Sequence, residues 1–182
     1  MSRIDESRQF IPLKIAVLTV SDTRTLEDDR SGSTLVARLE EAGHTLADRA
    51  IVTDDVAIIQ NKVRGWVEDE GVDAVITTGG TGLTGRDVTP EALEAIFEKR
   101  IDGFSTAFHI LSYEKIGTST IQSRATAGVA GGTYIFCLPG SPGACKDGWD
   151  GILKNQLDYR HMPCNFVEIM PRLDEHLQRT KS

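Results

Sequence analysis

The residues best suited to chemistry in this sequence are glycines and threonines crowded between positions 77 and 92. That segment reads Thr-Thr-Gly-Gly-Thr-Gly-Leu-Thr-Gly-Arg-Asp-Val-Thr-Pro-Glu-Ala. Glycines let backbone amides approach an anion with no side chain in the way, and threonine hydroxyls add further donors. The alternative use of so many glycines is a tight turn between a strand and a helix. We favour the anion and predict a binding loop made by Gly79, Gly80, Thr81 and Gly82.

Asp87, at the end of the same loop, is unexpected because a carboxylate would repel a bound phosphate. The conflict disappears if a divalent cation bridges the two, and hard oxygen ligands of this kind suit Mg²⁺. Asp54, which follows another predicted strand, is a second candidate for a catalytic role. The alternatives are structural: Asp87 pairs with Arg86 or caps the next helix, and Asp54 caps the helix that follows it.

Polar residues also follow two other predicted strands. Ser141, in the stretch Pro-Gly-Ser-Pro that begins at Pro139, lies at a predicted helix N-terminus, where a hydroxyl and free amides would face one anion. Ser21 and Asp22 end the first predicted strand and could line the same crevice. Their alternatives are an ordinary N-cap for Ser141 and a side-chain turn for the pair.

The glycine spacing also matches a dinucleotide-binding fingerprint at Gly80, Gly82 and Gly85. We reject a nicotinamide-dependent oxidoreductase because the helix begins only at Thr89. In addition, no second strand ending in an acid lies ~20 residues further on, as the fingerprint requires. The histidines and cysteines show no metal-ligand spacing, and the three cysteines form no disulfide pattern.

The elements that must position these groups alternate between strands and helices. Residues 15–20 form a continuous apolar run, which is typical of a strand buried on both faces of a parallel sheet. Residues 118–132 fit no clear assignment. Strands are predicted at 15–20, 47–53, 72–78 and 133–138, and helices around 35–43, 56–71, 89–100, 104–117 and after 143.

This alternation predicts a single α/β domain, a three-layer α/β/α arrangement with a mostly parallel sheet. Ligands of such open sheets bind beyond the carboxyl ends of the strands, where the strand order reverses. We therefore expect the site at the strand ends near Val20, Thr78 and Leu138. The domain is predicted at 13–170, between an N-terminal arm at 1–12 and a C-terminal tail at 171–182.

The bulk properties exclude several classes of function. The net charge of −7 disfavours binding to nucleic acid and to anionic membranes. No apolar run approaches the ~20 residues needed to span a bilayer. The first residues lack the apolar core of a signal peptide, so the expected location is the cytoplasm.

Taken together, these motifs resemble those of the MoaB/MogA family, which includes the G domain of gephyrin. The resemblance rests on residues 77–92, on the stretch that begins at Pro139 and on shorter matches, and it covers roughly residues 13–167. Residues 116–124 are more similar to B-type members of the family. The resemblance implies a molybdopterin-binding fold that assembles as a homo-oligomer, either a trimer or a hexamer. We expect apolar positions of the helix at 104–111 to meet a neighbouring subunit.

The resemblance also implies an activity. Active members use ATP and Mg²⁺ to adenylylate molybdopterin before molybdate insertion, alongside other cofactor-biosynthesis enzymes. The family's two functional acids fall on Asp54 and Asp87, and Asp87 is the candidate magnesium ligand. Its glycine loop falls on 79–82, and its pterin-side loop on Pro139, Gly140 and Ser141. The sequence leaves two functions open: an adenylyltransferase, or a non-catalytic carrier or scaffold that binds the pterin.

Overall fold

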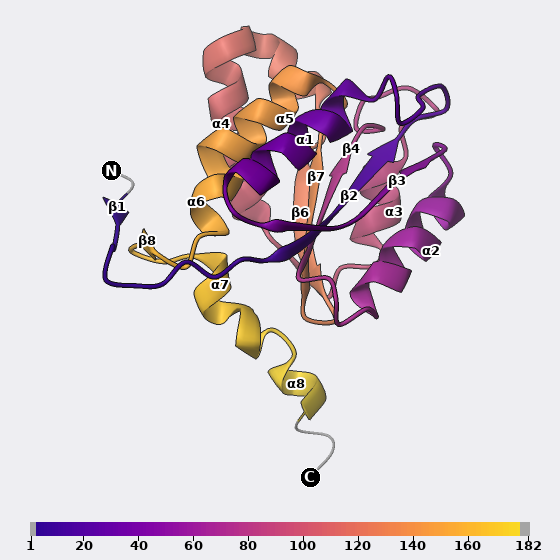
Figure 1. Ribbon diagram of the computed structural model, residues 1–182. Coiled ribbons are helices and arrows are strands. Elements are labelled where there is room, and N and C mark those ends of the chain that lie inside the picture. Colours follow the sequence, from indigo (N-terminus) through magenta and orange to yellow (C-terminus); the bar gives the residue numbers. More distant parts are fainter. Residues whose placement is uncertain (1–2, 179–182) are drawn as a thin grey trace.

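Four parallel strands form the centre of the sheet in the computed structural model, which describes residues 3–178 (Figure 1). The six-stranded sheet has the order β3-β2-β4-β7-β6-β5. The antiparallel strand β6 continues it beyond β7, and the short β5 forms the edge. This confirms the predicted mostly parallel α/β fold. The strands are β2 (Lys14–Val20), β3 (Thr45–Val52), β4 (Ala74–Thr78), β5 (Lys99–Arg100), β6 (Thr126–Ala130) and β7 (Thr133–Leu138).

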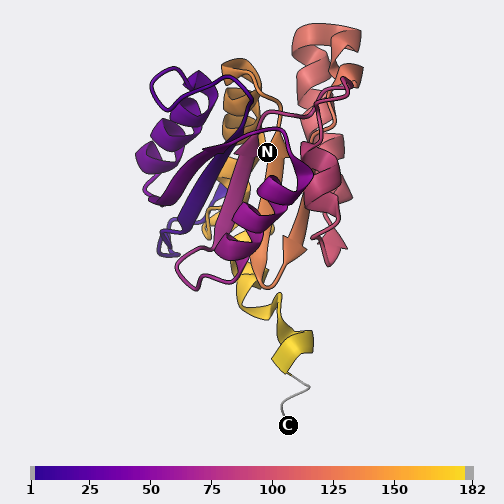
Figure 2. The same cartoon turned by 90° about the vertical axis from the view of Figure 1, so that its right-hand side faces the viewer.

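Helices cover both faces of this sheet, as the alternating pattern predicts (Figures 1 and 2). One face carries α1 (Arg30–Glu41), α4 (Asp102–Ile116) and α5 (Pro142–Gly148). The last of these continues through η2 (Trp149–Leu153), a wider π-helical turn, into α6 (Lys154–Gln156). The other face carries α2 (Val56–Val67) and α3 (Thr89–Glu94).

The strands divide their apolar residues between two cores because successive side chains point to opposite faces of a sheet. In β2, Ile15 and Val17 pack with α1 and α4, whereas Ala16 and Leu18 pack with α2 and α3. Each of these four side chains is fully buried. The continuous apolar run in the sequence therefore reflects burial on both sides.

The segment that the sequence left unassigned completes the sheet. After Gly117 the chain forms η1 (Gly117–Gln122), a 3₁₀ helix, and then β6. The hairpin to β7 turns on Gly131 and Gly132, which have φ of 55° and 85°. Positive φ favours glycine, and this explains why the connection is short and rich in glycine.

The predicted helix at 89–100 is wrong in its second half, since α3 ends at Glu94. The amide of Glu98 donates to Val129 O at 2.8 Å, and that of Ile101 donates to Ala127 O at 2.8 Å. These backbone amides donate to β6 and not to a preceding turn of helix. The chain after Glu94 therefore forms the edge of the sheet where the sequence pattern predicted a helix. The helix predicted around 35–43 begins earlier than expected, because Asp29 caps α1 at Arg30 by accepting from Gly32 N.

The terminal segments make regular contacts where they are described. β1 (Arg3–Ile4) pairs with β8 (His161–Met162), and the Phe10 ring packs against His44. The chain ends in α7 (Phe166–Ile169), η3 (Met170–Arg172) and α8 (Glu175–Gln178). Residues 1–2 and 179–182 of the predicted arm and tail lie outside the described residues. No helix between residues 3 and 178 is long and apolar enough to cross a membrane.

Candidate functional site

The three strand ends expected to carry the site lie side by side. β4 is hydrogen-bonded to β2 on one side and to β7 on the other, all in parallel. From β2 the chain passes to β3 on one side and later to β4 on the other, so the strand order reverses between β2 and β4. A side chain at Gly79 (φ 100°) would place its Cβ 2.2 Å from Val20 O, so only glycine fits between these ends.

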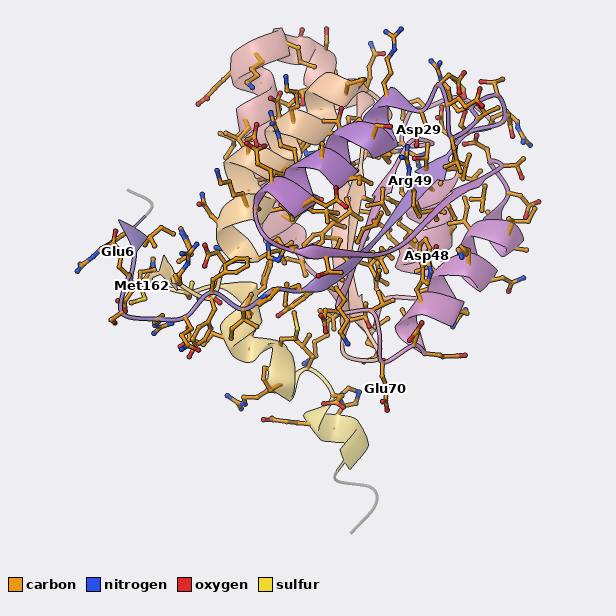
Figure 3. The ribbon with its side chains drawn as sticks, viewed as in Figure 1. Glu6, Asp29, Asp48, Arg49, Glu70 and Met162 are labelled. Atoms are coloured by element: carbon orange, nitrogen blue, oxygen red, sulfur yellow. The ribbon has the colours of Figure 1, made fainter. Side chains whose placement is uncertain are left out.

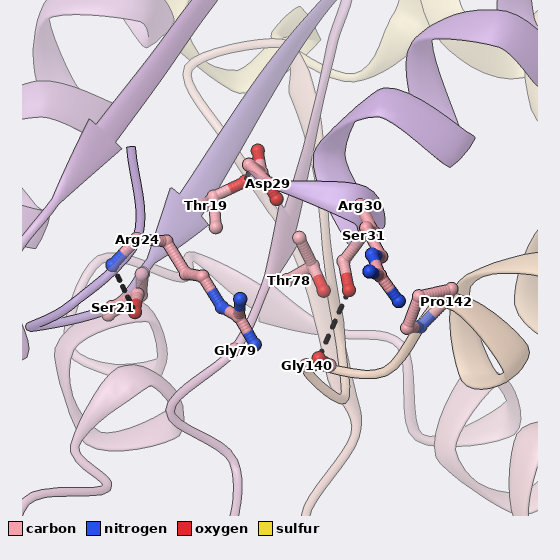
Figure 4. A pocket seen from close by; sticks show the side chains of 11 residues that line it. Thr19, Ser21, Arg24, Asp29, Arg30, Ser31, Thr78, Gly79, Gly140 and Pro142 are labelled. Carbon is pink, nitrogen blue, oxygen red and sulfur yellow. Dashed lines mark hydrogen bonds between the residues drawn. The ribbon is translucent and has the colours of Figure 1, made fainter. Parts of the chain in front are cut away.

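A cavity of about 360 Å³ opens at this reversal (Figure 4). Of the predicted ligand-binding residues, Ser21, Gly79 and Gly140 line it. Arg24 and Arg30 line it as well; neither was predicted as a site residue, although Arg30 lies in one of the shorter family matches, at residues 29–32. The other lining residues are Thr19, Val20, Asp29, Ser31, Thr78 and Pro142.

The acid in this cavity is neutralised. Asp29 is 2% exposed, and its carboxylate accepts from Arg49 Nη2 at 2.9 Å and from Thr19 Oγ1 at 2.7 Å. Figure 3 shows Arg49 and Asp29 close together beside α1. A buried carboxylate is stable only with such partners. Its charge is therefore already balanced, and the arginines of the cavity are left to act on a ligand.

The predicted acids do not line this cavity, and Asp54 lies against the next glycine, Gly80. A side chain there would place its Cβ 2.2 Å from Thr89 Oγ1 and 2.8 Å from Asp54 Oδ1, so both oxygens face the space above this glycine. Thr89 is fully buried, and its hydroxyl has no hydrogen-bond partner among the described residues. Burial, then the charges of Asp22 and Asp87, raise the pKa of Asp54 above its usual value.

Neither structural alternative for Asp54 and Asp87 is found. Asp55, not Asp54, caps α2 by accepting from Ile58 N at 3.0 Å. No side chain caps α3, and Arg86 binds Asp22 in a two-pronged pair at 2.8 and 2.9 Å. Neither acid is therefore a helix cap, and Asp87 is not the partner of Arg86.

Asp87 instead holds its own loop. Its Oδ2 accepts from the hydroxyl of Thr84 at 2.6 Å and from the amide of Thr84 at 2.9 Å. These bonds, the hydroxyl first, lower the pKa of Asp87. The carboxylate is thus an anion at neutral pH, and it lies against Gly82, where a Cβ would come within 2.7 Å of Oδ2.

Arg124 holds the glycine loop from outside, a role the sequence did not reveal. Its amide donates to Thr81 O at 3.1 Å, and its guanidinium donates to Gly82 O and Asp87 O, both at 2.9 Å. It also pairs with Glu91 at the start of α3. Arg124 therefore joins both ends of the loop to the segment that leads into β6. The sequence pointed to Arg124 only through its place in the family match at 116–124.

The hydroxyls of Ser21 and Ser141 have the structural roles given above as alternatives to ligand binding: a side-chain turn for Ser21 and a helix cap for Ser141. Ser141 caps α5 by accepting from Ala144 N at 3.1 Å, and Ser21 accepts from the amides of Thr23 and Arg24, both at 3.2 Å. Asp22 accepts from Asp54 N at 3.1 Å, which ties the first loop to the acid. These groups shape the site whether or not they also touch a ligand.

The donor set fits magnesium bound together with a ligand's phosphates. Among the described residues no three His, Cys, Asp or Glu side chains come together as a metal site. Mg²⁺ is commonly held by one or two carboxylates plus substrate phosphates and water. Asp54, Asp87 and the partnerless hydroxyl of Thr89 supply oxygen atoms of this kind.

Comparison with known proteins identifies the family. A family model for a probable molybdopterin binding domain matches residues 16–159. Molybdenum cofactor biosynthesis protein B of Escherichia coli (strain K12) is 50% identical over 160 residues, which cover 88% of this chain and 94% of that protein. The chain belongs to the MoaB/MogA molybdopterin-binding family.

Solved structures of this family share the fold. A crystal structure of molybdenum cofactor biosynthesis protein B superposes with a TM-score of 0.83 at 37% identity, over 92% of this chain and 99% of that one. The tungsten cofactor synthesizing protein MoaB from Pyrococcus furiosus gives a TM-score of 0.71 at 35% identity, over 79% of this chain and 92% of that one. The resemblance inferred from the motifs is thus confirmed.

Proposed function

We propose that this protein binds molybdopterin and transfers AMP to it from ATP with the help of Mg²⁺. The observation that carries the proposal is a site with two neighbouring parts at the reversal point of a MoaB/MogA fold. A cavity with two arginines opens beside Gly79, while two carboxylates with opposite pKa shifts lie along the next glycines, Asp54 against Gly80 and Asp87 against Gly82. A reaction between two phosphate-bearing substrates needs two such anion-handling regions next to each other.

The proposed reaction is a nucleotidyl transfer. A terminal phosphate oxygen of molybdopterin attacks the α-phosphorus of ATP; the new P–O bond forms as the bond to pyrophosphate breaks. Positioning and charge neutralisation do most of the work in phosphoryl-type transfers. Bound Mg²⁺ would supply positive charge against the phosphates of ATP. Asp87, an anion at neutral pH, is suited to hold it.

Asp54 is suited to a different task. Burial and the nearby charges of Asp22 and Asp87 raise the pKa of Asp54, so its surroundings disfavour the charged form. A cation bound nearby would stabilise the charged form of Asp54. Asp54 and the hydroxyl of its neighbour Thr89 are therefore suited to help hold the magnesium–nucleotide complex. Product carrying AMP would then pass to an enzyme that inserts the metal, the partner class expected for such a protein.

The test is release of pyrophosphate from ATP in the presence of molybdopterin and Mg²⁺. We expect turnover in the wild type and none after chelation with EDTA. Asp87→Asn keeps the shape and removes the charge, so turnover should fall by about 10²–10³-fold, since each ~1.4 kcal/mol is tenfold in rate. Molybdopterin affinity should persist, because the amides around Gly80 remain.

Two results would contradict this proposal. Normal turnover by Asp87→Asn with a lowered melting temperature would mean that the bonds to Thr84 are the whole role of Asp87. Pterin binding without turnover in the wild type would leave the carrier or scaffold as the function of this site.

A further inference from the structure

We infer that two side chains of α4, His109 and Ser105, position Arg124 and, through it, the loop that carries Asp87. Only the assignment of Asp87 to magnesium rests on the proposed function. Neither side chain contacts a substrate in this arrangement, so both are positioning residues. His109 shows no metal-ligand spacing in the sequence, and the structure gives its ring a different task.

The chain between η1 and β6 is held by α4 at two points. The hydroxyl of Ser105 donates to Ala125 O at 2.5 Å. One helical turn later, His109 Nε2 lies 2.9 Å from Ser123 O. A carbonyl oxygen only accepts, so the ring donates to Ser123 O in each form that has a proton on Nε2. The other ring nitrogen lies 2.6 Å from Ser105 O, and the imidazolium form donates to both carbonyls.

Arg124 lies between these two points and reaches the glycine loop. Successive residues of an extended chain point to opposite sides, and Ser123 is extended, with φ of −97° and ψ of 142°. The carbonyls of Ser123 and Ala125 bind α4. The guanidinium of Arg124 instead donates to Gly82 O and Asp87 O, both at 2.9 Å. The alternation therefore divides this short segment between α4 and the loop.

The two bonds from α4 matter because the sheet does not hold this segment. The pairing of β6 with β7 begins at Thr126, so residues 123–125 lie before it. The amide of Arg124 donates to Thr81 O at 3.1 Å, which is a contact with the same loop. If α4 released the segment, its conformational entropy would oppose every contact that Arg124 makes. The bonds from Ser105 and His109 remove that freedom in advance.

The loop that Arg124 holds is the one that fixes Asp87. The Asp87 carboxylate accepts from the amide and the hydroxyl of Thr84, and Asp87 N donates to Thr84 O at 3.0 Å. Arg124 closes this turn from outside. Mg²⁺ demands nearly ideal octahedral geometry, so a carboxylate that moves with a loose loop would bind it less tightly. His109 and Ser105 thus act on Asp87 through Arg124.

The direct test is hydrogen exchange at the amides of Thr84 and Asp87, which are hydrogen-bonded within the loop. His109→Leu removes the donor and keeps a side chain that favours helix, so both amides should exchange about fivefold faster. His109→Gln restores a donor for Ser123 O and should stay within about twofold of wild type.

Two further variants separate this role from the stability of the helix. Ser105→Ala removes the bond to Ala125 O, yet alanine favours helix, so the loop should exchange about threefold faster while α4 is not weakened. Thr106→Ala is the matched control. The exposed Thr106 hydroxyl donates to Asp102 O within α4, so its loss should change loop exchange by less than about twofold.

A double-mutant cycle with Arg124 shows whether the effect passes through that side chain. Arg124→Lys already loses the fork of donors to the loop, so adding His109→Leu should speed exchange by less than a further factor of about two. Independent effects would multiply, and that result would overturn the inference. Unchanged exchange in His109→Leu, or an equal increase in His109→Gln or in Thr106→Ala, would overturn it as well.

The turnover assay keeps this inference apart from the proposed function. His109→Leu should raise KM for magnesium-ATP about fivefold and leave KM for molybdopterin within about twofold, because the loosened loop carries the metal ligand. An equal rise in both constants would contradict a role through Asp87. If the wild type shows no turnover, the proposed function fails, and the exchange measurements still decide whether α4 positions Arg124.

Discussion

The two acids beside the glycine loop have opposite electrostatic surroundings although they share one site. Hydrogen bonds from Thr84 stabilise the charge of Asp87, whereas burial and like charges destabilise that of Asp54. Pairs of carboxylates pushed apart in this way are common where each has a separate task. The positions of Asp54 and Asp87 in the sequence motifs identified both acids. The sequence could not show that their pKa values shift in opposite directions, because the shifts depend on neighbours in the folded chain.

Asp54→Asn should make the protein more stable and less active. Because the folded state raises the pKa of Asp54, it binds this proton more tightly than the unfolded chain does. The free energy of unfolding therefore falls as pH rises from the unfolded pKa through the folded one. The variant should melt about 1–3 °C above wild type at pH 7 and about equal to it near pH 4. Thermal melts across that pH range measure the difference.

The neighbouring acid is a matched control for that variant. Asp55 caps α2, so Asp55→Ala should lower the free energy of unfolding by about 1 kcal/mol and leave turnover unchanged. A lower melting temperature in Asp54→Asn, or full turnover, would mean that Asp54 is structural after all.

At the scale of elements, Arg124 joins the glycine loop to the segment that leads into β6. Lysine cannot replace its fork of donors to Gly82 O and Asp87 O. We expect Arg124→Lys to lower the melting temperature by about 2–5 °C and to speed amide exchange between residues 81 and 88. Turnover should fall as the loop loosens.

Arg100→Lys is the control for that change. Arg100 lies on the edge strand β5, and its ion pairs with Glu94 and Asp102 are largely exposed. Such pairs contribute little, so the melting temperature should move by less than about 1 °C. Equal effects of the two substitutions would show that the Arg124 contacts do not stabilise the loop.

The sequence predicted the central elements well because their signals are local. The apolar run of β2 reflects burial of each of its residues. The end of α1 is marked by Gly43, whose φ of 92° favours glycine. The end of α3 and strand β6 could not be read in this way. Their backbone groups are satisfied by partners far along the chain, such as the bond from Glu98 N to Val129 O. Periodicity says nothing of such pairing.

The same limit explains what was missed in the site. The glycines and acids stood out because their types are unusual at strand ends. Arg24 carried no signal in the sequence, and Arg30 only its place in the family match at 29–32, because the loop after β2 brings both to the cavity only in the folded chain. The charge balance of the cavity also depends on the pairing of Asp29 with Arg49, an interaction between residues of different elements.

At the scale of the whole molecule, α4 leaves apolar side chains in contact with solvent, and one of them, Ile110, lies within the expected stretch 104–111. Phe104 and Phe108 belong to the chain's own core. The exposed residues lie on later turns: Ile110 is 58% exposed, Tyr113 57% and Ile116 56%. In Figures 1 and 2 this end of α4 reaches past the carboxyl ends of the strands. Residues three apart share one side of a helix, so the three form a stripe.

We expect this stripe to join copies of the chain, as the family resemblance implies. Monomers rarely leave contiguous apolar patches open to water, and the net charge of −7 opposes nonspecific aggregation without preventing a specific contact. Sedimentation at micromolar concentration should show a trimer or hexamer. The double variant Ile110→Lys/Ile116→Lys should sediment as a smaller species, because two charges would have to be buried.

The control is Ile58→Lys, which changes an apolar residue of similar exposure (46%) on α2, across the sheet from α4. It adds the same kind of charge outside the stripe and should leave the assembly intact. Circular dichroism should show both proteins folded, since lysine is a good helix former and the altered side chains already contact water. A stable wild-type monomer would rule out self-association, and equal dissociation by Ile58→Lys would move the interface away from α4.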